Sequence, residues 1–189
     1  MFYFSLGILI LTEGASLYRK RRSFVFKYIF IGGVILIFGF LFYQSWLQYR
    51  VWSQNELSKF LLPPYQSIAY FLGYSFTRFF KNYLISLVVA LLFLSAAVFL
   101  NKKFQERFFE KEELYLGALA IFLVGHPFWM FYFLAVMTVG VLGSLFLKVT
   151  SYHAYRQAGK LQVTSRRFPF YRFWLPLAIL VLIIGKVLI

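Results

Sequence analysis

The chain has 189 residues, of which 61% are hydrophobic and 23% are aromatic, and its formal net charge is +14. It contains no Cys and no Asp, since all six acidic residues are Glu, and this excludes an aspartyl dyad, a cysteine nucleophile and a zinc site with Cys ligands. A soluble domain of this length would carry more than the 14% of charged residues found here. The composition therefore predicts an all-α, polytopic integral membrane protein with a single membrane domain.

Six apolar runs approach the length of about 20 residues that a helix needs to cross the hydrocarbon core of a bilayer. In chain order they are residues 1–18, 24–47, 83–100, 114–125, 128–147 and 173–189. Gly125, His126 and Pro127 divide the fourth run from the fifth, which predicts a tight helical hairpin at that point. The sequence thus predicts about six transmembrane helices in the cytoplasmic membrane of the cell.

Residues 48–82 are the least regular part of the chain. Pro63 and Pro64 break any helix around them. Apolar residues then recur at near-helical spacing between 68 and 79. We expect an external segment over 48–82 that contains an interfacial helix at about 66–80. The sequence leaves open whether this helix lies in the interface, re-enters the bilayer or crosses it.

Basic residues are concentrated in three of the predicted loops. The loops 18–27, 101–113 and 148–172 hold 15 of the 20 Lys and Arg residues, so the positive-inside rule places these loops in the cytoplasm and the N-terminus outside. The residues expected to contact anionic lipid headgroups are Arg19, Lys20, Arg21, Arg22, Arg166 and Arg167. Because the basic residues form no separate domain, we expect no nucleic-acid partner.

Three residues are weak candidates for chemistry: Glu113, Glu56 and His126. In the segment 102–113, Glu residues alternate with Lys and Arg, which favours a self-neutralised surface helix over an acid–base or cation-binding pair at Glu113. A lone His is a poor metal site, so we expect His126 to form a hydrogen bond at the hairpin turn. Glu56 precedes the broken helix at 61–67, which either lines a cavity or is an ordinary connector.

Aromatic residues are dense in the segment 56–82, and aromatic side chains dominate the energetics of interfaces. We hypothesise that this segment recognises a membrane partner or a lipid through exposed residues, among them Phe71, Tyr74 and Arg78. The alternative is that the segment only caps the outer rim of the bundle. No cofactor and no metal are expected, since the chain has no P-loop, GxGxxG, GxSxG or HExxH motif.

Three stretches resemble, in their order, the membrane half of the type IV prepilin peptidases. They are KFLLPPYQSIAYFLG (59–73), EKEELYLGALAIFLVGHPFW (110–129) and RFPFYRFWLPLAI (167–179). That family has an Asp-containing stretch followed by a Leu/Ile-Pro turn, a Gly-x-Gly-Asp motif that opens a span, and a Pro-Phe sequence before the last span. The resemblance covers roughly residues 56–189.

The chain departs from that family at its catalytic positions. Both aspartates are absent: the matching positions hold Ser58 or a neighbour and Glu113, and Lys111 and Glu112 replace the flanking Gly-x-Gly. The resemblance therefore implies a catalytically silent relative. Our leading interpretation is a non-enzymatic prokaryotic membrane protein that binds a membrane partner or lipid. The alternative is an intramembrane enzyme or transporter that uses one of the three candidates for chemistry.

Overall fold

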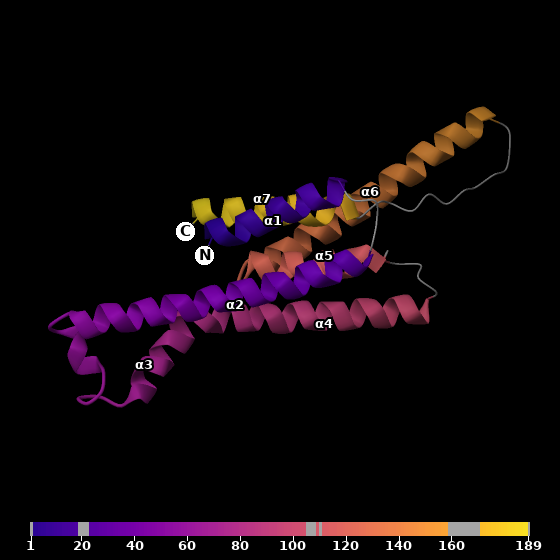
Figure 1. The fold of residues 1–189 in the computed structure, drawn as a ribbon. Helices are drawn as coiled ribbons and strands as arrows, with labels where there is room; N and C mark the ends of the chain where they lie inside the picture. Colours follow the sequence, from indigo (N-terminus) through magenta and orange to yellow (C-terminus); the bar gives the residue numbers. More distant parts are fainter. Residues whose placement is uncertain (1, 19–22, 105–108, 110, 159–170, 189) are drawn as a thin grey trace.

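A computed structural model of the chain describes residues 2–18, 23–104, 109, 111–158 and 171–188. Every regular element in these residues is a helix (Figure 1). In chain order the elements are α1 Phe2–Tyr18, α2 Ser23–Gln54, the 3-10 helix η1 Ser58–Leu61, α3 Ile68–Ser75, the π-helix η2 Phe76–Phe80, α4 Lys81–Lys103, α5 Lys111–Val124, α6 Trp129–Ala158 and α7 Tyr171–Leu188. The predicted all-α fold class is confirmed for this part of the chain.

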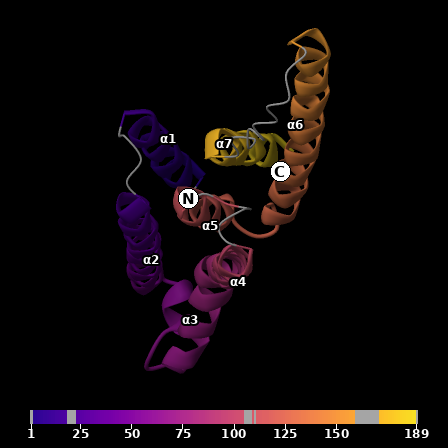
Figure 2. The same cartoon turned by 90° about the vertical axis from the view of Figure 1, so that its right-hand side faces the viewer.

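Helix α5 is the centre of the bundle, and α1, α2, α4, α6 and α7 surround it (Figure 2). Every residue from Leu116 to Val124 is buried. This helix is apolar around its whole circumference, so it has no polar face to turn outward and is buried on all sides. The small side chains of Ala118 and Ala120 allow the neighbouring helices to approach it closely.

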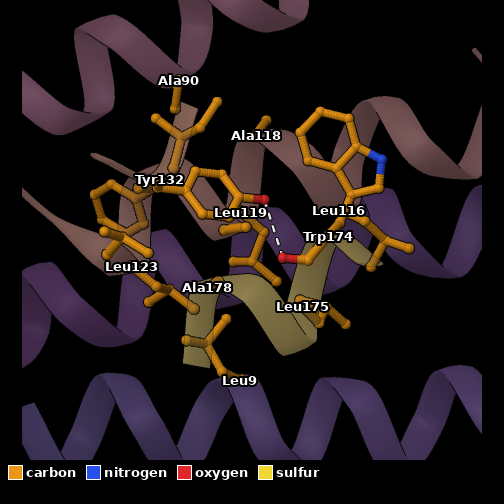
Figure 3. Close-up of a cluster of buried hydrophobic side chains, with 14 of the residues drawn as sticks. Leu9, Ala90, Leu116, Ala118, Leu119, Leu123, Tyr132, Trp174, Leu175 and Ala178 are labelled. Atoms are coloured by element: carbon orange, nitrogen blue, oxygen red, sulfur yellow. Dashed lines mark hydrogen bonds between the residues drawn. The ribbon is translucent and has the colours of Figure 1, made fainter. Parts of the chain in front are cut away.

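Aromatic rings of α4 and α7 lie directly against α5 at Gly117. A Cβ atom on Gly117 would lie 2.8 Å from Cε1 of Phe93 and 3.0 Å from Cζ3 of Trp174, so a larger residue here would force one of these rings to shift. Tyr132 of α6 reaches the same region, and its Oη donates a hydrogen bond of 3.0 Å to the main-chain carbonyl of Trp174 (Figure 3). The centre is thus filled by large rings packed against small residues.

Helices α2 and α4 both pack against α5. At one end of the bundle the chain extends past α5, where η1 follows α2 and α3 leads back toward α4 (Figure 1). The chain reverses at Asn55, whose Oδ1 accepts hydrogen bonds from the N–H groups of Leu57 (2.9 Å) and Ser58 (3.1 Å). A side chain that captures the following N–H groups in this way competes with the helix and ends α2. On the return, α3, η2 and α4 form one continuous helix from Ile68 to Lys103.

Successive long helices run in opposite directions along the bundle. As a result, the two chain ends marked N and C lie near each other at the end of the bundle from which α2 and α3 extend (Figure 1). The end of α1, the start of α2, the end of α4 and the start of α5 lie at the opposite end. The turn between α5 and α6 is at the N and C end, and there Gly125 has a φ of +80°, which favours glycine.

The helices do not end where the sequence predicts. Helix α2 continues past residue 47 to Gln54, and α6 continues past 147 to Ala158, into the predicted basic loop. The residues of the predicted interfacial helix at 66–80 form α3 and η2, which continue without a break into α4. Within 48–82 only residues 55–67 lie outside these long helices. Pro63 and Pro64 interrupt the helix only around themselves, and residues 48–54 contain no Gly or Pro.

Among the described residues, three helices are long and apolar enough to cross a membrane. These are Val25–Gln54, Ile68–Lys103 and Trp129–Phe146. Shorter apolar helices are found at Phe2–Ser16, Glu113–Val124 and Phe173–Val187. The length and composition of the three long helices indicate insertion into a membrane.

Candidate functional site

Glu113 is buried, with 2% of its side chain exposed, in the first turn of α5. Phe109, two residues before α5, is attached to the end of α4. Asn101 of α4 fixes it, since its Nδ2 donates to the carbonyl of Phe109 (2.7 Å) and its Oδ1 accepts from the N–H of Phe109 (3.0 Å). The Phe109 ring lies 6.2 Å from Phe93 and 6.4 Å from Trp174 between centroids.

This burial corrects the prediction that Glu113 belongs to a surface helix. Its position in the first turn of α5 is one at which the helix dipole favours a carboxylate, and this is a physical reason for a Glu at the end of an otherwise apolar core helix. The side chains of Glu106, Glu110 and Glu112 lie outside the described residues.

The three candidates for chemistry do not come together. His126 follows the other end of α5, so about 20 Å of helix separates it from Glu113. Glu56 is exposed in the turn beyond the far end of α2 (Figure 1). Within the described ranges, no three His, Glu, Asp or Cys side chains are grouped so that they could hold a metal ion. None of the three candidates therefore lies close enough to another of them to form an acid–base pair.

The residues predicted to contact lipid headgroups, Arg19, Lys20, Arg21, Arg22, Arg166 and Arg167, lie outside the described residues. Their assignment stays a prediction. Three described basic residues are exposed at the end of the bundle where α2 begins and α4 ends: Lys27 of α2 and Lys102 and Lys103 of α4.

The part of the chain that extends past the bundle is residues 47–78, which we call the projecting hairpin. Four aromatic residues hold its two arms together. Trp52 of α2 lies 5.6 Å from Phe71 and 4.8 Å from Tyr74 of α3 between ring centroids, and Tyr49 lies 5.3 Å from Phe71. We call this set the aromatic clasp. It fixes the angle between the arms.

The clasp changes the roles predicted for two site residues. Phe71 is buried, with 6% exposed, and Tyr74 is half-buried, so the expected exposure of these rings is not found. Both rings hold the hairpin together instead. Arg78 is exposed, as a binding residue would be.

A different set of apolar side chains on the hairpin is exposed. The sequence did not single out these four residues as binding candidates: Tyr65, Tyr70, Leu72 and Phe76, with 63%, 46%, 58% and 51% exposed. The spacing of Tyr49 to Trp52 and of Phe71 to Tyr74, three residues in each case, places each pair on one helix face. This spacing is the feature of the sequence that could have indicated that the two pairs face each other.

A pocket of about 240 Å³ lies at the N and C end of the bundle. Helices α1, α4 and α7 and the turn between α5 and α6 form it. Its apolar lining includes Phe2, Val124, Phe128 and Leu182, and its polar lining includes Asn82, Tyr83, His126 and Lys186. Of these polar residues the sequence identified only His126. The other three come from segments that no local pattern connects.

Comparison of the chain with protein-family models, with curated proteins and with solved structures finds no match. The function is therefore inferred from the projecting hairpin and the pocket themselves.

Proposed function

We propose that the chain is a non-enzymatic integral membrane protein of a prokaryotic cell membrane that binds a membrane partner through the projecting hairpin. The observation that carries this proposal is the aromatic clasp. It uses one set of rings to fix the two arms and leaves a second set of apolar side chains exposed on a rigid support.

Exposed Lys and Trp residues on α2 and α4 support a membrane band of about the thickness of a bilayer. Lys81 and Lys102 are exposed at the two ends of α4, and the helical rise between them is about 32 Å. On α2, the rise from exposed Lys27 to exposed Trp46 is about 29 Å. Both values are close to the hydrocarbon thickness of about 30 Å, and Lys and Trp are residues that favour its boundaries.

We propose a six-span topology, which this band and the alternating directions of the helices support. In this proposal α1, α2, α4, α5, α6 and α7 cross or occupy the band, with the basic loops in the cytoplasm and the N-terminus outside. Helix α5 has 14 residues, a length of about 21 Å, but it is enclosed by protein and need not match the bilayer.

The projecting hairpin then lies outside the band. Arg50 marks its base on α2, with its guanidinium 4.9 Å from the centroid of the Trp46 ring. Arg78 marks the base of the other arm. A partner with an apolar patch would bury the exposed set Tyr65, Tyr70, Leu72 and Phe76, and exposed Arg78 would lie at the polar rim.

The positions of Ser58 and Glu113 support the absence of catalysis. In the resemblance to the prepilin peptidases, Ser58 or a neighbour and Glu113 match the positions of the two aspartates, and an acid–base pair must act on one substrate bond. Ser58 lies in η1 at the tip of the projecting hairpin, and Glu113 lies at the other end of the bundle (Figure 1). We therefore keep the proposal that any relationship to that family is a catalytically silent one.

Photo-crosslinking tests the binding proposal. A crosslinking amino acid at position 70 or 76, in the full chain in native membranes, should give a protein adduct of defined mass. The matched control is position 92, because Leu92 is 64% exposed on α4 inside the proposed band and should crosslink to lipid. Lipid adducts alone at positions 70 and 76 would show that the hairpin lies on the bilayer, and the partner proposal would fail.

A second arm of the experiment removes the proposed contact. Tyr70→Ser combined with Phe76→Ser should abolish an adduct formed from position 65, while the melting temperature of the purified protein stays the same. Both side chains are about half exposed, so their loss should not open the core. An adduct that persists in this variant would also contradict the proposal.

One observation favours the alternative of an intramembrane enzyme or transporter. Glu113 is an enclosed carboxylate in a membrane bundle, and such residues are often functional. We expect no processing of a prepilin-like substrate and no proton or cation uptake into proteoliposomes. Either activity, lost in Glu113→Gln and kept in Glu56→Gln, would establish the alternative in place of our proposal.

A further inference from the structure

The pocket at the N and C end of the bundle combines apolar walls with donor groups. Phe2, Phe128 and Leu182 provide apolar wall, while Asn82 and Lys186 are exposed at its polar side. Its volume of about 240 Å³ is below the range of about 300–1,000 Å³ that is typical of small-molecule sites. This size suits a headgroup or a short chain segment.

The charge of the pocket is positive. Lys186, in the last turn of α7, is the charged residue among the described lining residues, and no carboxylate is found among them. Asn82 adds an amide with two donor hydrogens, and Lys186 has three. An ammonium group beside apolar walls gains from an anion that accepts these hydrogen bonds, because charge-assisted hydrogen bonds are the stronger class.

His126 adds a further donor. Its Nδ1 is buried and has no hydrogen-bond partner among the described residues. A proton on Nδ1 would be a buried, unpaired N–H, so the neutral ring is better served by the tautomer with its proton on Nε2. In that tautomer the ring offers an N–H donor at the pocket.

The pocket lies at the height of the proposed membrane boundary. Asn82 follows Lys81, which marks the edge of the band on α4. At this height a bound molecule can place a polar group among the donors and an apolar group toward the hydrocarbon region.

We propose that this pocket binds the anionic headgroup of an amphiphile, a phosphate or a carboxylate. Lys186, Asn82 and His126 would donate to the anion, and Phe2, Phe128 and Leu182 would contact its apolar part. The inference uses the proposed membrane band to set the depth of the pocket. It concerns a surface other than the projecting hairpin, so the crosslinking result at the hairpin does not decide it.

The test uses the purified full chain in a neutral detergent and water-soluble probes. Dihexanoyl phosphatidic acid and dihexanoyl phosphatidylcholine have the same chains and differ in headgroup charge. The acid should bind about tenfold more tightly, the factor expected for one hydrogen bond to a charged group. Equal dissociation constants for the two lipids would overturn the proposal.

Two variants locate the site. Lys186→Gln should weaken binding of dihexanoyl phosphatidic acid about tenfold and leave binding of the phosphatidylcholine unchanged. Lys102→Gln is the matched control, because Lys102 is also exposed in the last turn of a helix but lies at the opposite end of the bundle. Equal losses in both variants would show attraction by the overall positive charge alone, and the pocket site would be rejected.

A further arm distinguishes the source of the anion. Inorganic phosphate that displaces the lipid in a Lys186-dependent way would identify a site for soluble anions. Lipid binding that phosphate does not displace would identify a site for the amphiphile itself. Asn82→Leu provides a second check on the donors. It should weaken binding of dihexanoyl phosphatidic acid more than binding of the phosphatidylcholine, and unchanged binding of the acid would contradict the assigned role of Asn82.

Discussion

The hydroxyl group of Tyr132 donates a hydrogen bond of 3.0 Å to the main-chain carbonyl of Trp174, and this bond joins α6 to α7 in the centre of the bundle. Tyr132 is fully buried and Trp174 is 3% exposed. The bond is therefore shielded from solvent, and it satisfies a buried hydroxyl group that bulk water cannot reach.

Replacing Tyr132 with Phe should lower the free energy of unfolding by about 1 kcal/mol, the net value of a typical hydrogen bond. The ring stays in place, so the loss reports the hydroxyl group. Thermal or denaturant unfolding in detergent would measure it. Tyr43→Phe is the matched control, since Tyr43 is 51% exposed, and it should change stability by only a few tenths of a kcal/mol. Equal effects in the two variants would contradict the role of this bond.

Gly117→Ala should destabilise the bundle by about 1–3 kcal/mol, because the new Cβ overpacks the core. It would lie 2.8 Å from an atom of Phe93, whose ring is itself held among Phe109, Phe133 and Trp174. Gly39→Ala is the control: nothing lies within 4 Å of its added Cβ. There we expect unchanged stability, or a gain of up to about 1 kcal/mol from helix propensity. A Gly117→Ala protein as stable as wild type would show that Phe93 can move aside.

Trp52→Ala should loosen the projecting hairpin without unfolding the bundle. It removes the ring contacts to Phe71 and Tyr74, and aromatic pairs contribute about 0.5–1.5 kcal/mol each. Amide hydrogen exchange over residues 55–67 should become at least about tenfold faster, while exchange in α5 stays the same. Trp46→Ala, at a half-exposed Trp outside the clasp, should leave the hairpin protected. Loss of protection in α5 on removal of Trp52 would mean that the hairpin is part of the core.

The topology can be tested with single Cys residues, because the chain contains none. Asn55→Cys should be labelled by an impermeant reagent from outside, and Lys160→Cys from the cytoplasmic side. Residue 160 lies outside the described residues, so Lys102→Cys, at the end of α4, serves as a second cytoplasmic position. Labelling of positions 55 and 160 from the same side would overturn the proposed six-span arrangement.

The helical fold class could be predicted from the sequence because it depends on the length and composition of apolar runs. The ends of the helices could not. Residues 48–54 and 148–158 are polar enough to read as loops, but neither stretch contains a Gly or a Pro that would break a helix. Helix α2 ends only at Asn55, whose side chain captures the next N–H groups. A hydropathy pattern marks where a helix is apolar, and hydrogen bonds decide where it stops.

The pocket could not be predicted, because its donors come from distant parts of the chain. Asn82 and Lys186 are ordinary polar residues near helix ends, and only the packing of α4 and α7 around α5, together with the turn at Gly125, brings them to one pocket. Glu113 shows the opposite difficulty. The charges around it favoured a surface helix, whereas the apolar stretch that follows it determined its burial.

The contacts of α1 have a consequence for how the protein is made. Helix α1 contacts α7 far more extensively than it contacts its neighbour α2. During synthesis α1 is the first of the described helices to leave the ribosome and α7 is the last, so in the proposed six-span arrangement α1 would enter the bilayer before its main partner has been made. Contacts between such distant segments form late and slow the final folding step. A chain interrupted before α7 would leave both α1 and the apolar surface of α5 facing lipid, which is the state that a membrane quality-control protease would encounter.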